Sequence, residues 1–503
     1  MQVKTQPDDL ENYVNDASNL KGGNCSKLFV PQSAAEIADI LRDANESNVA
    51  VTISGARTGT VGGAIPFGGF VISLEKLNRI KEIRKEELTV TAEPGVILAD
   101  LQKAVEAENL FYPPDPTEWS CQVGGTVATN ASGARSFKYG ATRNHVKFLK
   151  IVLANGENLN IRRGENKADA EGILRLLTEQ GSHIQIIVPT YERPNVRKNV
   201  SGYFSEEGLD AIDLFIGSEG TLGVITEIEF AVLPKPEGFF SGIVFFEDED
   251  NLLDLVFEAR DLSFANRKLE TANKLDASLL EYFDANALEF IREKFPEVPE
   301  KMAGAIFFEQ ETTAETEDAL LEQWNALLEK HGADLERSWF TTTEIDREKM
   351  RSFRHSLPVA VNERISRYKQ KKVGTDMAVP DENFAGFLRF YKRTLNASGL
   401  DHVIFGHIGD NHLHANILPK NDLEAEKGRY LYGRFVAQSI MLGGTISAEH
   451  GIGKLKSKYL NVMMGERYLN EMAAIKKALD PRGILGRGNM FDEKLLYSAD
   501  FKV

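Results

Sequence analysis

The sequence has little cysteine and no long apolar segment. Its 503 residues include two cysteines, Cys25 and Cys121, too few for a disulfide framework or a cysteine-rich metal site and typical of a reducing compartment. No apolar run approaches the ~18 residues that a membrane-spanning helix needs, and the acidic N-terminal segment lacks the apolar core of a secretion signal. We therefore expect a cytoplasmic protein without a transmembrane segment, which would be membrane-associated only through a partner.

The chain also lacks an excess of basic charge. Against 59 Lys and Arg there are 75 Asp and Glu, which gives a formal charge of −16. A protein that coats nucleic acid needs a net basic face, so this balance argues against a nucleic-acid partner. With 42% apolar and 27% charged residues the composition is that of a folded globular protein, and the length predicts two to three domains at roughly 150 residues each.

The first part of the chain predicts strands and helices in alternation. Ser33 and Glu36 have the spacing of a capping box, which opens a helix that we expect to end near Asn45. The apolar spacing in 97–108 predicts another helix. Short β-branched runs predict strands at 49–53, 70–74, 88–92, 148–154 and 159–161.

A domain boundary is expected where two prolines fall within three residues. Pro234 and Pro236 end the segment from Val232, and proline continues neither a sheet nor a helix. Beyond this point the chain is richer in long charged helical stretches such as Glu317 to Lys330, for which a solvated helix face is the expected role.

Three glycine-rich runs follow or precede predicted strands. They read GARTGTVGG at 55–63, GGTVATNASG at 124–133 and GSEGTLG at 217–223. Small residues let backbone N–H groups approach an anion closely, which suits a pyrophosphate. None of the runs has the dinucleotide GxGxxG pattern or the Gly-Lys-Ser/Thr ending of a phosphate-binding loop, so nicotinamide binding and nucleotide hydrolysis are disfavoured.

Histidine is concentrated in the last quarter of the chain, which holds five of the nine. Residues 403–419, VIFGHIGDNHLHANILP, predict a strand, a turn at Gly409 to Asn411 and a second strand on which His412, His414 and Asn416 share a face. Further on, Glu449 and His450 are adjacent. Two histidines and a glutamate with an open position suit a divalent metal such as zinc, while hydrogen-bonded sheet histidines are the alternative that spacing alone leaves open.

Six motifs in order give the chain a resemblance to a known family. They read SGARTGTVGGAIP, EPGVILADL, PPDP with VGGTVATNASGARSFKYG, IGSEGTLGVITE, GHIGDNHLH and SAEHGIGK, and they span nearly the whole chain. This set resembles the flavin-linked 2-hydroxyacid dehydrogenases of the vanillyl-alcohol-oxidase-like (PCMH-type) FAD fold, a family that includes D-lactate dehydrogenase, the glycolate oxidase catalytic subunit and D-2-hydroxyglutarate dehydrogenase.

The resemblance implies an α+β fold with a defined order of domains. A PCMH-type FAD-binding domain of two subdomains is expected at 1–236, and an α+β substrate (cap) domain with an antiparallel sheet at 237–440. The remaining segment, 441–503, would carry the Glu-His-Gly motif and return to pack on the FAD domain.

The resemblance also implies non-covalent FAD, because the first glycine loop contains no His or Cys to attach it. Cys121 lies close to the second run and is interpreted as a packed thiol. The residues that match cofactor contacts of the family are Ser54, Gly55, Ala56, Arg57, Thr58, Gly59, Gly62, Gly63, Pro114, Asp115, Gly124, Gly125, Thr129, Asn130, Gly133, Gly140, Glu219, Gly223, Ile225 and Asn489.

The family's metal and proton-transfer residues are matched near the C-terminus. His407, His414 and Glu449 correspond to metal ligands, with zinc expected first and manganese or iron as alternatives. His450 corresponds to the catalytic base, and an imidazole with a pKa near neutrality accepts a hydroxyl proton well. The family usually reads GHxGDGNxH, whereas this chain has Asn411 and His412 in place of Gly-Asn, so His412 inherits no role.

Three further residues match the positions that hold the substrate carboxylate in the family. They are Arg354, Lys372 and Asn416. Arginine suits a carboxylate better than lysine does, because its planar fork donates two parallel hydrogen bonds.

The function expected is therefore FAD-dependent, metal-assisted oxidation of a D-2-hydroxy acid, D-lactate first and D-2-hydroxyglutarate or glycolate as alternatives. Electrons would pass to an external acceptor such as a quinone, a cytochrome, an electron-transferring flavoprotein or an iron–sulfur protein, and a homodimer is an open assembly. Two different classes also stay open: a metal-dependent hydrolase, in which the His/His/Glu site activates water, and a flavin-bearing scaffold subunit.

Overall fold

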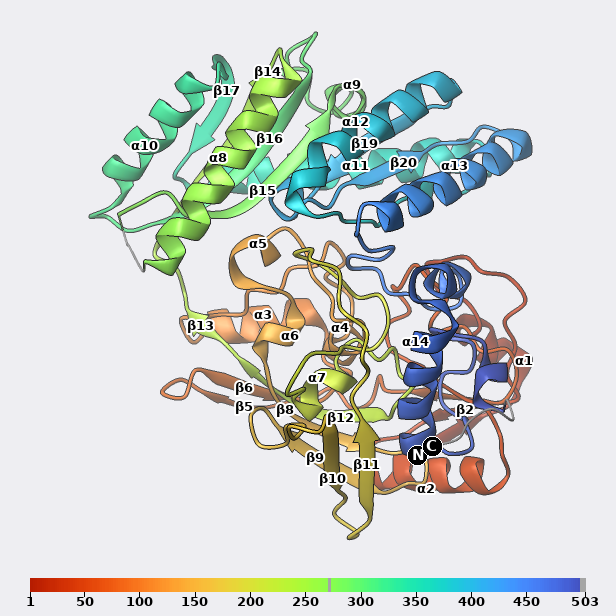
Figure 1. The fold of residues 1–503 in the computed structure, drawn as a ribbon. Helices are drawn as coiled ribbons and strands as arrows, with labels where there is room; N and C mark the ends of the chain where they lie inside the picture. Colours follow the sequence, from red (N-terminus) through yellow and green to blue (C-terminus); the bar gives the residue numbers. More distant parts are fainter. Residues whose placement is uncertain (270–272, 498–503) are drawn as a thin grey trace.

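The computed structural model describes residues 1–269 and 273–497 of the chain. Two sheet-containing parts lie one above the other, with the N-terminal half of the chain in the lower part (Figure 1). The middle of the chain builds the upper part, and the C-terminal helix α14 (Ser457–Leu479) lies beside the lower part again. No helix within these described ranges is long and apolar enough to cross a membrane.

The first subdomain is a four-stranded sheet in the order β1-β2-β4-β3. Its parallel strands carry buried β-branched and aromatic residues, and α2 packs its apolar face on the sheet. Ser33 accepts the N–H of Glu36, as a cap should, but the Glu36 carboxylate accepts from Gln32 rather than from Ser33, so the capping box is only half formed. The elements are β1 (Gln2–Lys4), α1 (Pro7–Leu10), β2 (Lys27–Val30), α2 (Ala34–Glu46), β3 (Val51–Ser54) and β4 (Phe70–Ser73).

The second subdomain is a five-stranded antiparallel sheet in the order β5-β6-β12-β8-β9. A turn at Asn155 and Gly156 joins β8 to β9, and Gly156 has a φ of +81°, which glycine adopts without strain. The strands are β5 (Ile80–Arg84), β6 (Thr89–Ala92), β8 (Val146–Val152), β9 (Asn158–Arg162) and β12 (Val224–Ala231), with a separate ribbon of β10 (Ile173–Leu177) and β11 (His183–Ile187). The helices are α3 (Leu98–Glu106), α4 (Val123–Thr129), α5 (Ser136–Tyr139), α6 (Thr142–His145) and α7 (Ala211–Phe215).

The prolines after β12 lie at the crossing between the two parts. The expectation that they end all sheet pairing is wrong, because β13 (Leu233–Pro234) still pairs with β7 (Leu110–Phe111). This pairing is only two residues long, and proline is tolerated there because it lies at an edge. The next strand, β14, begins at Gly238 and belongs to the upper sheet.

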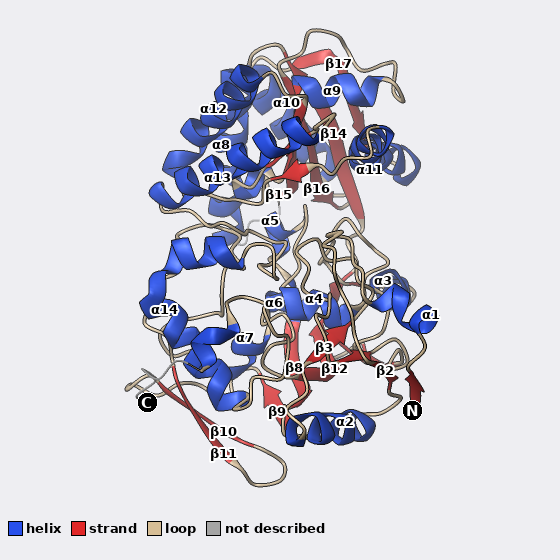
Figure 2. Ribbon diagram, turned by 90° about the vertical axis from the view of Figure 1, so that its right-hand side faces the viewer, coloured by secondary structure: helices blue, strands red, loops and turns tan. Residues whose placement is uncertain are grey.

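The upper part is a seven-stranded sheet in the order β17-β14-β16-β15-β19-β20-β18, with antiparallel pairing throughout. Buried residues of α9 and α11 cover one face, and those of α8, α10, α12 and α13 cover the other (Figure 2). The strands are β14 (Gly238–Phe246), β15 (Ala277–Asp284), β16 (Gly304–Thr312), β17 (Asp334–Thr341), β18 (Val373–Gly374), β19 (His402–Gly406) and β20 (His414–Ile417). The helices are α8 (Glu249–Lys268), α9 (Ala285–Arg292), α10 (Glu317–Lys330), α11 (Glu344–Arg367), α12 (Asp381–Ser398) and α13 (Asp422–Met441).

The C-terminal segment returns to the first subdomain. The N–H of Val51 donates to Ile484 O, and Val51 forms a bridge with Leu485. Lys476 on α14 is buried and donates to Thr221 O, Leu485 O and Asp480. The α+β fold with a returning C-terminal segment is therefore confirmed, while the domain limits 1–236, 237–440 and 441–503 stay a proposal.

The stacked pair Phe308 and Trp324 anchors α10 to the upper sheet. Their ring centroids lie 3.9 Å apart and Trp324 is 0% exposed. We predict that Trp324→Ala lowers stability by about 3–5 kcal/mol, because it removes a buried indole and leaves a cavity. The midpoint of denaturant unfolding measures this. Ile345→Ala, at a side chain that is 85% exposed, is the control and should unfold like the parent; equal midpoints for the two variants would contradict the prediction.

Candidate active site

The three glycine-rich runs border one cavity of about 350 Å³ in the lower part of the molecule. The first run follows β3, the second begins α4, and the third leads into β12. A Cβ added at Gly59 or Gly125 would meet no protein atom within 4 Å, so these glycines leave space open, whereas one at Gly124 would lie 2.4 Å from the Pro94 side chain. Gly124 is therefore needed for the close approach of α4 to Pro94, and Gly125 for the space itself.

Many of the residues predicted to contact the cofactor line this cavity. Those that do are Gly55, Ala56, Arg57, Thr58, Gly59, Gly63, Gly124, Gly125, Thr129, Glu219, Gly223 and Ile225. Those that do not are Ser54, Gly62, Pro114, Asp115, Asn130, Gly133, Gly140 and Asn489.

Several residues outside the lining hold the walls in place. Asn130 ends α4 with a φ of +49° and accepts the N–H of Arg143, and Asp115 accepts the indole N–H of Trp119. Asn489 donates to Gly63 O at 3.0 Å and to Glu219 O at 3.2 Å, so the C-terminal segment braces the first and third runs.

The cavity also has lining residues that the sequence interpretation missed. Pro94, Thr117, Gln122 and Ser132 border it, and so does Cys121. Cys121 is a packed thiol, and burial raises its pKa to about 12. Pro94 lies in the motif EPGVILADL and Ser132 in the second glycine-rich run, so the family pattern marks their neighbourhoods; Thr117, Gln122 and Cys121 lie outside these motifs.

The histidines come from the predicted hairpin. Strands β19 and β20 pair with Phe405 opposite His414, and a 3-10 turn at Ile408–Asp410 joins them. The prediction that His412 lies on the second strand is wrong: β20 begins at His414, and His412 lies in the connection, where it bridges to Ala378.

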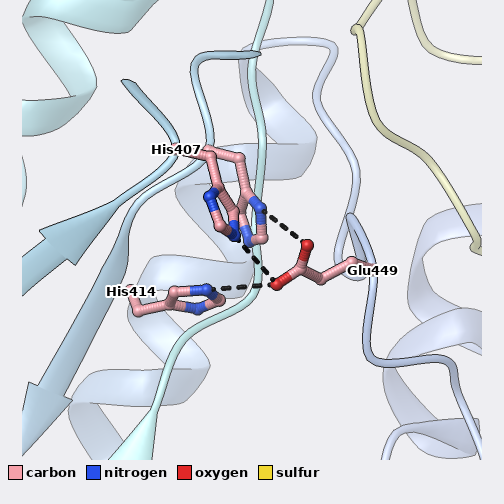
Figure 3. Close-up of side chains that lie close together, drawn as sticks. His407, His414 and Glu449 are labelled. Atoms are coloured by element: carbon pink, nitrogen blue, oxygen red, sulfur yellow. Dashed lines mark hydrogen bonds and ion pairs between the residues drawn. The ribbon is translucent and has the colours of Figure 1, made fainter. Parts of the chain in front are cut away.

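Three imidazoles and one carboxylate converge at this hairpin. His407 Nε2 and His414 Nε2 each lie 3.3 Å from Glu449 Oε1, and His412 Nδ1 lies 3.9 Å from Glu449 Oε2. One ligand atom of each of the four residues falls within 4.8 Å of all the others. Figure 3 shows His407 and His414 pointing from the hairpin toward Glu449, which a different segment carries. These four residues are called the histidine cluster below.

Outer partners hold two of the imidazoles in position. His407 Nδ1 lies 2.5 Å from the carboxylate of Glu281 on β15, and His414 Nδ1 lies 3.1 Å from Thr375 O. Each ring therefore presents Nε2 to Glu449. This arrangement, with the outer ring nitrogen bound to an oxygen, is typical of metal-ligating histidines.

Glu449 is held from the FAD-binding side. Its Oε2 accepts from Ser132 Oγ at 3.0 Å and from Lys198 Nζ at 3.2 Å. Lys198 also donates to Gly133 O and is 4% exposed. The carboxylate is buried, which raises its pKa, but Lys198 and His407 outweigh burial and hold that pKa well below its usual range.

The pKa values of the imidazoles are shifted in different directions. Burial lowers the pKa of His407, but Glu281 more than offsets it and the net pKa is raised. Burial lowers the pKa of His412 to about 3 and that of His450 to about 4. His412 and His450 are therefore neutral at pH 7, the form in which a ring nitrogen can bind a metal or accept a proton.

His450 lies where the cavity meets the histidine cluster. Its side chain is 36% exposed and lines the cavity together with Glu449. Its ring stacks on His414 with centroids 5.1 Å apart and an interplanar angle of 6°. The buried Asp376 fixes this stretch, because its carboxylate accepts the backbone N–H of Glu449 and of His450, each at 3.1 Å.

The three residues predicted to bind a substrate carboxylate come from different elements. Arg354 on α11 is 11% exposed and donates from Nε to Glu281 at 2.8 Å, which in turn contacts His407. Asn416 on β20 is buried and donates to His414 O. Lys372 is exposed and directly precedes β18, whose Gly374 pairs with Asn416. Asn416 thus contacts a member of the histidine cluster directly, and Arg354 reaches the cluster through Glu281.

The residues that support the histidine cluster were not predicted from the sequence. Lys198, Glu281 and Asp376 lie more than 30 residues from the ligands they contact and belong to no short spacing pattern. Their proximity arises only when β15, β18 and the loop before α7 meet.

Comparisons with known proteins agree with this architecture. Residues 26–162 match the FAD binding domain family, and residues 260–490 match the family of FAD linked oxidases, C-terminal domain. Glycolate oxidase subunit GlcD of Bacillus subtilis (strain 168) is 30% identical over 92% of this chain and 88% of its own length. D-lactate dehydrogenase of Anaerostipes hadrus is 31% identical over 95% of this chain and 92% of its own length.

Solved structures show the same fold at lower identity. The 4-ethylphenol oxidase from Gulosibacter chungangensis has a TM-score of 0.70 at 19% identity, covering 98% of this chain and 95% of that one. p-Cresol methylhydroxylase has a TM-score of 0.70 at 17% identity, covering 98% and 94%. The chain therefore belongs to the FAD-linked oxidases with a PCMH-type FAD-binding domain. Within them it is a member of the FAD-linked 2-hydroxyacid dehydrogenase family.

Filling the cavity should remove the flavin without unfolding the protein. We predict that Gly125→Leu weakens FAD binding roughly 10- to 100-fold, because the new side chain occupies the cavity rather than the core. Flavin absorbance per protein after dialysis measures this. Gly386→Leu is the matched control, since Gly386 is also helical and has open space around it but lies on α12. Full flavin content in the Gly125 variant would exclude this cavity as the flavin site.

Proposed function

We propose that the protein is an FAD-dependent, metal-assisted dehydrogenase that oxidises a D-2-hydroxy acid to the 2-oxo acid, with D-lactate as the first substrate and D-2-hydroxyglutarate or glycolate as alternatives. The observation that carries the proposal is the junction at Glu449 and His450, which both border the cavity. Glu449 belongs to the histidine cluster, and the ring of His450 stacks on His414. A substrate at this junction would have its α-carbon over a flavin and its hydroxyl beside the imidazoles. FAD bound in the cavity would accept the hydride.

The histidine cluster suits a divalent metal. His407, His414 and Glu449 are the ligands that we propose, with zinc first and manganese or iron as alternatives, since imidazole and carboxylate are common donors to these ions. The geometry of this protein supports the assignment, because the inner nitrogens and the carboxylate converge while the outer nitrogens of His407 and His414 are held by oxygen atoms. A divalent cation at this position would acidify the hydroxyl group of the substrate.

His450 is proposed as the group that takes the hydroxyl proton. It lies at the cavity, is partly exposed, and has its backbone held by Asp376, so its ring is both accessible and oriented. Lys198 and Ser132 hold Glu449 through Oε2, and its Oε1 lies 3.8 Å from His450 Nε2. General-base catalysis requires this combination of access and fixed direction.

The substrate carboxylate is proposed to bind Arg354, Lys372 and Asn416. The Nε of Arg354 donates to Glu281, and within the described part of the chain no hydrogen bond engages its two Nη groups. These groups are therefore available for a carboxylate fork. Electrons would leave the flavin for an external acceptor of one of the four classes named above.

Anaerobic titration of the flavin protein with D- and L-2-hydroxy acids tests the proposal. D-Lactate should bleach the flavin absorbance and L-lactate should not, because the fixed base and carboxylate site accept one hand of the substrate. The extent of flavin bleaching by D-2-hydroxyglutarate and by glycolate ranks these two alternative substrates. A yellow protein that no 2-hydroxy acid bleaches would favour a flavin scaffold, and a colourless protein with bound metal would favour a hydrolase.

His450→Asn should keep the flavin but slow its reduction. We predict a loss of about 10²- to 10⁴-fold in the rate of reduction by substrate, the contribution typical of a general base, with unchanged flavin content. Stopped-flow absorbance measures the rate. His183→Asn, at an exposed histidine on β11, is the control. Reduction of the His450 variant at the control's rate would remove His450 from this role.

A further inference from the structure

His412 is a buried histidine for which neither the family pattern nor the proposed mechanism has a role. Its side chain is 0% exposed. Its Nε2 lies 3.1 Å from the carboxylate of Asp376, whereas within the described residues Nδ1 has no hydrogen-bond partner. A buried polar atom without a partner loses its hydration and regains nothing, so the enclosed Nδ1 requires an explanation.

The position of His412 relative to the cluster supplies one. Its ring centroid lies 4.5 Å from that of His414 and 5.5 Å from that of His407. Nδ1 lies on the side of Glu449, 3.9 Å from Oε2, while Nε2 lies 3.1 Å from Asp376 Oδ1. The ring therefore presents one nitrogen to the centre of the cluster and the other to a carboxylate.

The same inside-and-outside arrangement holds for the two proposed ligands. His407 presents Nε2 inward and Nδ1 to Glu281, and His414 presents Nε2 inward and Nδ1 to Thr375 O. His412 differs only in which ring nitrogen points inward. A carboxylate that accepts from the outer N–H of a ligating imidazole fixes the orientation of the ring and raises the basicity of the ring. Asp376 would have this role for His412.

A purely structural role explains the contacts of His412 less well. His402, in the same hairpin, is also buried, but its Nδ1 lies 2.9 Å from Leu400 O and its Nε2 lies 3.2 Å from the Asn286 amide. Both ring nitrogens of His402 are thus satisfied by the protein, whereas Nδ1 of His412 is not.

We propose that His412 is a third imidazole ligand, so that the metal site consists of His407, His412, His414 and Glu449. This inference rests on the metal site in the proposed function and extends it. Three nitrogens and one oxygen form a donor set that favours zinc over manganese, which prefers oxygen-rich sites. With four protein ligands, the substrate hydroxyl would reach the zinc as a fifth ligand. The substrate carboxylate would then depend on Arg354 and its neighbours.

The number of coordinated imidazoles is the measurement that tests this. Zinc-edge X-ray absorption of the flavin-containing, zinc-loaded protein should fit three imidazoles, and the His412→Asn variant should fit two. Two imidazoles in the unchanged protein would overturn the inference, and so would a failure of the protein to bind zinc. This measurement on the parent decides the question even if the variant does not fold.

Zinc affinity gives a second readout. Chelator competition should show His412→Asn binding zinc at least about 10- to 100-fold more weakly, the range known for loss of supporting contacts at such sites. His402→Asn removes a buried histidine of the same hairpin outside the cluster and should bind zinc like the parent, while His414→Asn should lose zinc. Flavin content reports that each variant is folded. Equal zinc affinity for the His412 and His402 variants would contradict the proposal.

These results separate the inference from the proposed function. Flavin bleaching by a 2-hydroxy acid with only two coordinated imidazoles would leave the dehydrogenase intact and remove His412 from the site. Three imidazoles without bleaching would keep the metal site and remove the proposed reaction.

Discussion

The contacts of Asp376 are the constraint on which the site depends. This carboxylate is 0% exposed and accepts the backbone N–H groups of Glu449 and His450, the hydroxyl of Ser447 and the ammonium of Lys456. Asp376 lies in the upper part of the molecule, just after β18. The groups that it binds lead into the C-terminal segment, which packs on the lower part. The histidine cluster and the cavity bordered by the glycine-rich runs therefore share one boundary.

Burying so many carboxylates requires matched positive charge. Glu281 contacts Arg354 and His407, Glu449 contacts Lys198, and Asp376 contacts Lys456. The pKa of Asp376 is held well below its usual range, because burial, which raises it, is outweighed by the neighbours that favour the ionised carboxylate, the ammonium of Lys456 among them. An unpaired buried charge would be costly, so each partner in this network supports the ionised form of the next. A divalent cation would contribute further positive charge to a region in which several ionised carboxylates lie close together.

Much of the site could be predicted from local patterns, but its completion could not. The strand pairing of β19 with β20 follows from alternating residues, and α10 begins and ends at the residues expected for it, Glu317 and Lys330. His412 shows the limit: alternation placed it on the strand face of His414, but the 3-10 turn delays the strand until His414, so His412 approaches the cluster from the connection. In the connection His412 forms a backbone bridge with Ala378, a contact with a segment distant in the sequence, which a periodicity cannot include.

The sequence by itself determined the glycine-rich runs that leave space for a cofactor, the hairpin that carries the histidines, and the family to which the chain belongs. Each of these is local: a missing Cβ, an alternation, or a motif of about ten residues. Only the tertiary structure decided that Glu449 meets His407 and His414, that Lys198 and Asp376 hold that segment, and that Nδ1 of His412 has no hydrogen-bond partner among the described residues. The physical reason is that charge compensation and hydrogen-bond satisfaction are properties of neighbours in space, and here those neighbours come from segments far apart in the chain.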